Sequence, residues 1–157
     1  MPAWLTAAAV GIAGGLVASF VMDRYQDASA KAFGQDGGNA DPATVKAADT
    51  ASVAIEGRLV TQKHRAAAGS LVHYGTGTAL GLGSAFLAEA APIVTVGFGT
   101  AFGVATMLVL DDLLTPAMGW GPWPGLEPGV HLYSLTSHLV FGVALEGVRR
   151  GGLALLS

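Results

Sequence analysis

Residues 70–87 read SLVHYGTGTALGLGSAFL, a stretch of eighteen residues with no charged side chain and one histidine near its start. The uncharged run extends from Ala66 to Ala88, and His73 is its only ionisable group. A helix that crosses the hydrocarbon core of a bilayer needs about 20 apolar residues. The stretch therefore predicts a membrane-spanning helix that carries one imidazole.

The composition of the whole chain favours a membrane protein over a soluble domain. Charged residues make up 12 % of the 157 residues, against roughly 25 % in globular domains, and the mean hydropathy is +0.53. Glycine occupies 23 positions, as in membrane helices whose backbones approach closely. The chain has no cysteine, which excludes disulfides, thiolate metal sites and c-type haem. The net charge of −3 predicts no nucleic-acid partner.

Three further runs are long enough to span a membrane. They are Ala3–Met22, Ala90–Leu110 and Pro128–Leu145, and only the last holds ionisable side chains, His131 and His138. None has the regularly spaced polar face of a soluble helix. We predict an all-α polytopic membrane protein in a single domain, 1–157, with four transmembrane helices at 1–22, 66–88, 90–114 and 130–148.

The basic residues predict an orientation, because cytoplasmic loops of membrane proteins are enriched in lysine and arginine. The 23–65 segment carries six of the eight basic residues, and Arg149 and Arg150 are the other two. We therefore expect the 23–65 loop in the cytoplasm and both termini in the periplasm. No basic residue precedes Arg24 and the first run exceeds a signal-peptide core, so we expect it to remain as a span.

The two long loops differ in composition. In the first, Asp41 and Pro42 have the order of an N-cap and a first helical residue, which predicts a helix over about 42–60. This helix either lies at the membrane interface or is a soluble connector. The second loop, 115–129, is rich in proline, glycine and tryptophan and suits the headgroup region, where tryptophan is enriched.

Two motifs recur along the chain and indicate a duplication. The pattern H-x3-G-x-A-L starts at His73 and again at His138, and a glycine lies eight residues before an aspartate in 15–23 and in 103–111. These matches predict two tandem helical hairpins, related as a weak parallel repeat about an axis along the membrane normal.

The repeat predicts that histidines and aspartates gather at one depth. At 1.5 Å per residue, His73 and His138 lie ~10–12 Å inside the cytoplasmic ends of their spans. Asp23 and Asp111 end the first and third runs at the same side. Intramembrane ionisable groups are functional candidates, so these four residues form the candidate metal or haem site. The alternatives are interhelical hydrogen bonding by the histidines and helix termination at the aspartates.

The sequence leaves three chemistries open. Two facing imidazoles could ligate a b-type haem, and a mixed His/Asp set could bind a divalent metal such as zinc or iron. A proton relay is the third, with His131, His138 and Glu146 on one face of the fourth span as candidates. No enzyme motif is present, and we expect no catalytic residues.

Small residues recur at steps of four and predict close helix packing. The candidate packing glycines are Gly11, Gly15, Gly77, Gly81, Gly99, Gly103 and Gly142.

Five short stretches carry a resemblance to a known family. They are GGLVASFVMD at 14–23, HYGTG at 73–77, GFGTAFG at 97–103, DDLLTPAMG at 111–119 and SHLVFG at 137–142. Together they resemble the YagU-like family of bacterial inner-membrane proteins. The resemblance implies a small multi-span protein of the inner membrane, with a loose link to acid tolerance and with no catalytic residues.

Two functions remain as hypotheses. The first is a small inner-membrane protein whose His/Asp site binds metal or haem or relays protons. The alternative is an accessory or assembly subunit of a larger membrane complex without chemistry of its own. The expected partners are the lipid bilayer and either a second copy of the chain or a larger membrane complex.

Overall fold

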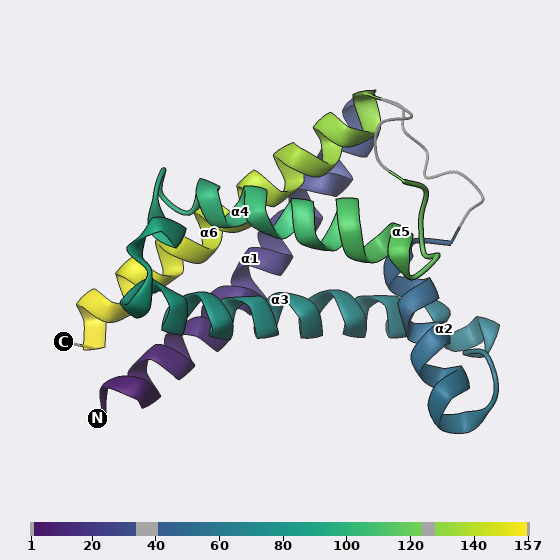
Figure 1. Ribbon diagram of the computed structural model, residues 1–157, viewed down its shortest axis with the longest axis horizontal. Coiled ribbons are helices and arrows are strands. Elements are labelled where there is room, and N and C mark those ends of the chain that lie inside the picture. Colours follow the sequence, from purple (N-terminus) through teal and green to yellow (C-terminus); the bar gives the residue numbers. More distant parts are fainter. Residues whose placement is uncertain (1, 34–40, 124–127, 157) are drawn as a thin grey trace.

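The computed structural model describes residues 2–33, 41–123 and 128–156, and these residues form helices and turns without a strand (Figure 1). The elements in chain order are α1 (Ala3–Phe33), α2 (Ala43–Glu56), η1 (Gln62–His64), α3 (Arg65–Ala90), η2 (Pro92–Thr95), α4 (Thr100–Met107), η3 (Leu108–Leu114), α5 (Thr115–Ala117) and α6 (Pro128–Leu156). The predicted all-α class is confirmed. Because α4, η3 and α5 follow one another without a break, they make one continuous helix over 100–117.

The long helices form two antiparallel pairs that meet along α1 and α6. Helix α1 packs against both α3 and α6, α4 packs against α6, and α2 packs against α3. Figure 1 shows both chain ends at one end of the bundle, with α2 and α5 at the opposite end. This is the chain path expected of four consecutive antiparallel helices. The interior polar groups described below lie towards the α2 end.

The bundle buries small side chains together with Met22, Met107, Phe141 and Leu145, and it exposes many other large apolar side chains. Its fully buried residues include Ala18 and Ser19, whereas Phe20 beside them is 54 % exposed and Leu71 on α3 is 75 % exposed. Soluble domains bury their large apolar residues, and wide exposed apolar surfaces mark interaction with lipid or protein. Within the described residues, two helices are long and apolar enough to cross a membrane, 3–32 and 100–117. These observations weakly indicate association with a membrane.

Helices α1 and α3 touch through their backbones. A methyl group on Gly15 would lie 2.7 Å from the Thr78 Cα atom, and one on Gly11 would lie 2.8 Å from the Gly81 carbonyl oxygen. Both distances are too short for a real contact, so the crossing requires glycine. Gly77 and Gly81 present the same close approach from α3. The predicted packing role of these four glycines agrees with this geometry.

Helices α4 and α6 cross in the same manner. A methyl group on Gly142 would lie 3.0 Å from the Gly103 amide nitrogen, and one on Gly103 would lie 2.9 Å from the His138 carbonyl carbon. Gly99 faces the backbone of Gly142, and a methyl group there would also lie 2.8 Å from Cβ of Glu146. Each pair therefore has a glycine crossing without intervening side chains.

Two predicted helix boundaries differ from the structure. Helix α1 continues through Asp23 to Phe33, so Asp23 does not terminate it. The third long helix begins at Thr100, ten residues later than the predicted span. Pro92 starts a short 3-10 turn, and 97–99 all have positive φ angles of 62°, 56° and 86°. This left-handed turn reverses the chain before α4, because a helix cannot continue through it.

The predicted loop helix is present as α2, but its ends differ. Gly57, with φ of 71°, caps it at Glu56 rather than near 60. Asp41 does not cap the helix; its carboxylate accepts a hydrogen bond from Arg65 at 2.6 Å. Burial lowers the pKa of Arg65, but hydrogen bonds and charges of Asp41 and Asp49 raise it overall. Residues 34–40 of the predicted 23–65 loop and residues 124–127 of the predicted 115–129 loop lie outside the described residues.

Gly15→Ala should destabilise the protein, because the added methyl group forces the α1 and α3 backbones apart. Overpacking of this kind costs about 1–3 kcal/mol. Thermal unfolding in detergent, followed by circular dichroism, measures the change. Gly75→Ala is the matched control on α3, where the methyl group would meet nothing within 4 Å; it should raise stability by about 0.5–1 kcal/mol. Equal midpoints for the two variants would contradict the crossing.

Candidate functional site

The first histidine forms a polar cluster between α1 and α3. Nε2 of His73 lies 3.1 Å from Oδ1 of Asp23 and 3.4 Å from the Ser19 carbonyl oxygen. The Tyr74 hydroxyl donates to the other carboxylate oxygen of Asp23 at 2.8 Å. The His73 and Asp23 side chains are 22 % and 32 % exposed in the bundle. One carboxylate thus holds an imidazole and a phenol from the neighbouring helix.

The second histidine forms the corresponding cluster between η3 and α6. Nδ1 of His138 lies 3.0 Å from the Ser134 carbonyl oxygen and 3.6 Å from Oδ2 of Asp111. The Ser134 hydroxyl donates a hydrogen bond to the same carboxylate oxygen. The His138 side chain is 8 % exposed, so this imidazole is more deeply buried than that of His73.

A third pair lies beside the second. Nδ1 of His131 is 3.5 Å from Oδ1 of Asp112, and the histidine is 44 % exposed. Asp111 and Asp112 both belong to the π-helical segment η3. Its wider turn directs two consecutive carboxylates at α6, one to Ser134 and one to His131. Single π turns within α-helices occur frequently at functional sites.

Other polar groups lie between the clusters. The Tyr25 hydroxyl on α1 donates to Oγ1 of Thr136 on α6 at 2.8 Å, which joins the two helix pairs at the level of the histidines. The Ser19 and Ser137 hydroxyls are fully buried and have no hydrogen-bond partner among the described residues. The interior near the histidines therefore holds more polar groups than helix packing alone requires.

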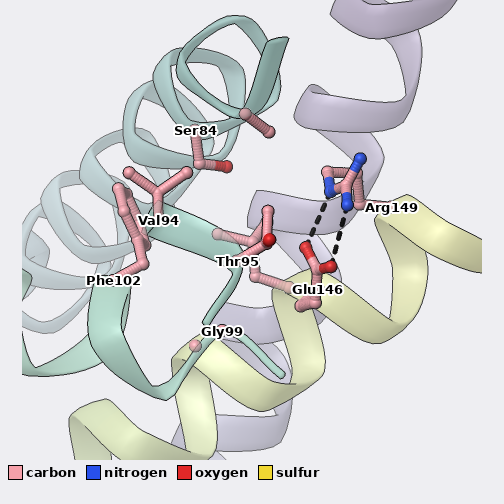
Figure 2. Close-up of a pocket in the computed structure, with 10 residues that line it drawn as sticks. Ser84, Val94, Thr95, Gly99, Phe102, Glu146 and Arg149 are labelled. Atoms are coloured by element: carbon pink, nitrogen blue, oxygen red, sulfur yellow. Dashed lines mark hydrogen bonds and ion pairs between the residues drawn. The ribbon is translucent and has the colours of Figure 1, made fainter. Parts of the chain in front are cut away.

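Glu146 is separate from these clusters. Its carboxylate accepts hydrogen bonds from Nε and Nη2 of Arg149 at 2.7 and 2.8 Å and from Nε of Arg150 at 2.6 Å. Figure 2 shows the Glu146–Arg149 pair at the edge of a small pocket between α6, η2 and the end of α3. The hydrogen bond to Glu146 raises the pKa of Arg149, against the lowering effect of burial. The Arg150 guanidinium lies over the Phe98 ring at 4.8 Å.

The structure brings some of the predicted site residues together and separates others. Asp23 pairs with His73, and Asp111 approaches His138, but no three histidine, aspartate or glutamate side chains of the described residues are grouped to hold a metal ion. The four candidate ligands therefore form two pairs, not one shared site. Of the predicted relay residues, Glu146 belongs to the arginine cluster instead.

Sequence reasoning missed two partners of the clusters. Tyr74 directly follows the predicted site residue His73, and this adjacency is its only signal in the sequence. Thr136 shares a helical face with neither histidine, so nothing in the spacing indicates its bond to Tyr25.

The chain was compared with protein-family models, with curated proteins and with solved structures. No family model, curated protein or solved structure matches it. The geometry of the clusters is accordingly the basis for any functional conclusion.

Proposed function

We propose that this chain is a four-span protein of the bacterial inner membrane, a member of the YagU-like family. The two remaining long helices, α3 and α6, supply the third and fourth crossing. Their outer faces carry exposed apolar side chains, including Leu71 at 75 % and Leu132 at 60 %. Ser84, Ser137 and His138 on these helices are buried inside the bundle, as intramembrane polar residues are. The excess of basic residues in 23–65 places this segment and the histidine clusters on the cytoplasmic side.

Within this protein, the two His–carboxylate clusters accept and relay protons. The observation that carries this proposal is the recurrence of one arrangement: an aspartate on one helix meets a histidine on the next, once in each pair, at the α2 end of the bundle. Histidine is the side chain that ordinarily titrates between about pH 5 and 8. The repeated cluster therefore provides two sites for a proton inside the bilayer boundary.

A proton fits these clusters better than a metal or haem. A metal site needs several ligands converging on one point, whereas each cluster offers one imidazole and one carboxylate, with Tyr74 or Ser134 bound to the same carboxylate. Bis-imidazole ligation needs two histidines facing one plane, and His138 directs Nδ1 to its own helix backbone. The hydroxyl and carboxylate groups instead form the short hydrogen-bonded links that a proton follows.

His138→Gln should lower proton flux in proteoliposomes by about tenfold or more, because glutamine keeps a hydrogen-bonding group but takes up no proton. A pH-sensitive dye inside the vesicles measures the flux after a pH step. His64→Gln is the matched control: His64 is an exposed residue of η1 whose ring hydrogen-bonds Thr61, outside the histidine clusters, and the change should leave the flux unchanged. Equal flux in both variants, or flux no greater than in empty vesicles, contradicts the relay.

The second candidate is an accessory subunit of a membrane complex, and α2 supplies the observation that favours it. Ile55 is 83 % exposed and Val53 is 46 % exposed on this helix, and Leu59 beyond it is 60 % exposed. These apolar side chains lie outside the proposed spans, where lipid tails do not cover them.

Ile55→Glu should reduce recovery of a partner from native membranes several-fold if this surface docks a protein, because a charge would then be buried at the interface. Affinity purification followed by mass spectrometry measures the recovery. Thr50 on α2 bonds Trp120 and is therefore unsuitable as a control; Ala51→Glu, on an exposed position of the same helix, is the matched charge addition. No change on Ile55→Glu would argue against the subunit.

A further inference from the structure

The two helix pairs repeat the same motifs but are packed in different registers. In the sequence, Gly15 corresponds to Gly103 and Gly77 corresponds to Gly142, by the repeated spacings to aspartate and histidine. In the first pair, Gly15 packs on Gly77. If the second pair copied the first, Gly103 would pack on Gly142.

The second pair instead lies one helical turn away from this arrangement. Gly142 packs on Gly99, and the backbone of His138 packs on Gly103. The carboxylates show the same offset. Asp23 makes its close contact with His73, whereas Asp111 is bound by Ser134, one turn before His138. Four residues of α-helix separate the two registers, which corresponds to about 5–6 Å along the axis.

We infer that the 100–117 helix has a second stable register on α6, one turn towards the C-terminus. In that register Gly103 packs on Gly142, and Asp111 faces His138 as Asp23 faces His73. Discrete one-turn shifts of one helix past another are a known form of switching, because packed interfaces are bistable rather than continuously deformable.

The contact surface permits both registers. Glycine lies at two successive turns of α4, Gly99 and Gly103, so either can lie opposite Gly142 without a clash between side chains. The π-helical segment η3 already holds an altered helical winding, and π turns of this kind occur frequently at functional sites. The helix can thus slide while keeping a backbone contact with α6.

The turn before α4 can change its backbone conformation, as the shift requires. Three successive residues, 97–99, have positive φ angles, and Phe98 among them is not a glycine. A left-handed bulky residue stores about 1–3 kcal/mol of strain. Phe98 is held under the Arg150 guanidinium, so a change of register would alter this stacking as well. Strain at this point lowers the cost of rearranging the turn.

Glu146 accounts for the register that the structure adopts. By the repeat it corresponds to Gly81, which receives Gly11 in the first pair. In the second register Gly99 would have to lie against Glu146, whose carboxylate is buried between two arginines. In the present register Gly99 approaches the Cβ atom of Glu146 but packs on Gly142, and Asp111 stays 3.6 Å from His138. Each register therefore favours one charged interaction, either that of Glu146 with the two arginines or that of Asp111 with His138.

Protonation shifts this balance, and this step rests on the proposed proton function. An imidazolium at His138 gains most from a carboxylate at hydrogen-bond distance, and the second register would bring Asp111 closer than its present 3.6 Å. The titratable or charged groups on the elements packed around this part of α6 are Asp111 and Asp112 on η3, Asp23, Arg24, Tyr25 and Asp27 on α1, and His131 and Tyr133 on α6 itself. Acidification should therefore populate the second register.

Spin labels measure the shift directly, because the chain has no native cysteine. Labels on cysteines that replace Met118 and Leu155, which are 48 % and 88 % exposed, report the distance between the moving helix and the C-terminal end of α6. Pulsed electron-spin distances in full-length protein in lipid nanodiscs should show a second population, shorter by about 5 Å, as the pH falls from about 8 to about 5. Labels at Phe20 and Leu155 join α1 to α6 and should show no change.

Two variants bias the registers in opposite directions. Ser134→Ala removes the hydroxyl that binds Asp111 only in the present register, and should raise the short-distance population at both pH values. His138→Asn removes the partner of the second register, and should leave only the long distance. Ser70→Ala, at an exposed position of α3, controls for the loss of a hydroxyl.

The inference would be overturned by a single Met118–Leu155 distance that does not change with pH, both in the unmodified chain and in Ser134→Ala. Circular dichroism confirms that both proteins are folded. Two distances that do not respond to pH would keep the second register and remove its coupling to protons. Two pH-dependent distances in a protein without proton flux would refute the relay but not the register shift.

Discussion

The structure depends on backbone-to-backbone contact between paired helices. Gly15 against Gly77, and Gly142 against Gly99, bring two helix axes closer than any larger residue permits. In lipid, helices gain little from the hydrophobic effect, and close packing with interhelical hydrogen bonds holds them together. Because the crossing is so tight, short side chains one or two turns away can reach the neighbouring helix. The His–Asp clusters are a consequence of this proximity, since Asp23 would otherwise fall short of His73.

The same packing limits the chemistry that the interior polar groups can perform. Small side chains such as Ala18 and Ser19 share the core with Met22, Phe141 and Leu145, and many other large apolar side chains lie on the outside. Buried polar groups must then satisfy one another, because an unpaired one is costly in a nonpolar environment. Asp111 takes a hydroxyl from Ser134, and Glu146 takes three donors from two arginines. Such self-contained clusters suit proton transfer better than the open ligand sets that metals require.

The sequence predicts those features that depend on residue spacing along one helix. Length and hydropathy predict the all-α class, and the repeated spacings predict that His73 and Asp23 approach each other. Features that depend on two helices together are not predictable in this way. The register of α4 on α6 differs by one turn from that of α1 on α3, and the late start of α4 follows from three left-handed residues. A run of uncharged residues hides such a turn, because hydropathy does not distinguish helix from loop.

The departures from the repeat are therefore informative about how the two pairs differ. Where the first pair has Gly81, the second has Glu146, and where the first has a regular helix through Asp23, the second has a π segment around Asp111. The first pair is consequently packed glycine on glycine with its carboxylate directly on the histidine, which leaves it no better alternative. The second pair has neither the complete glycine-on-glycine packing nor the direct contact between carboxylate and histidine. In the proposed repeat one copy is settled, and by the inferred second register the other is held between two arrangements, so the same motif would provide a fixed frame and a movable part.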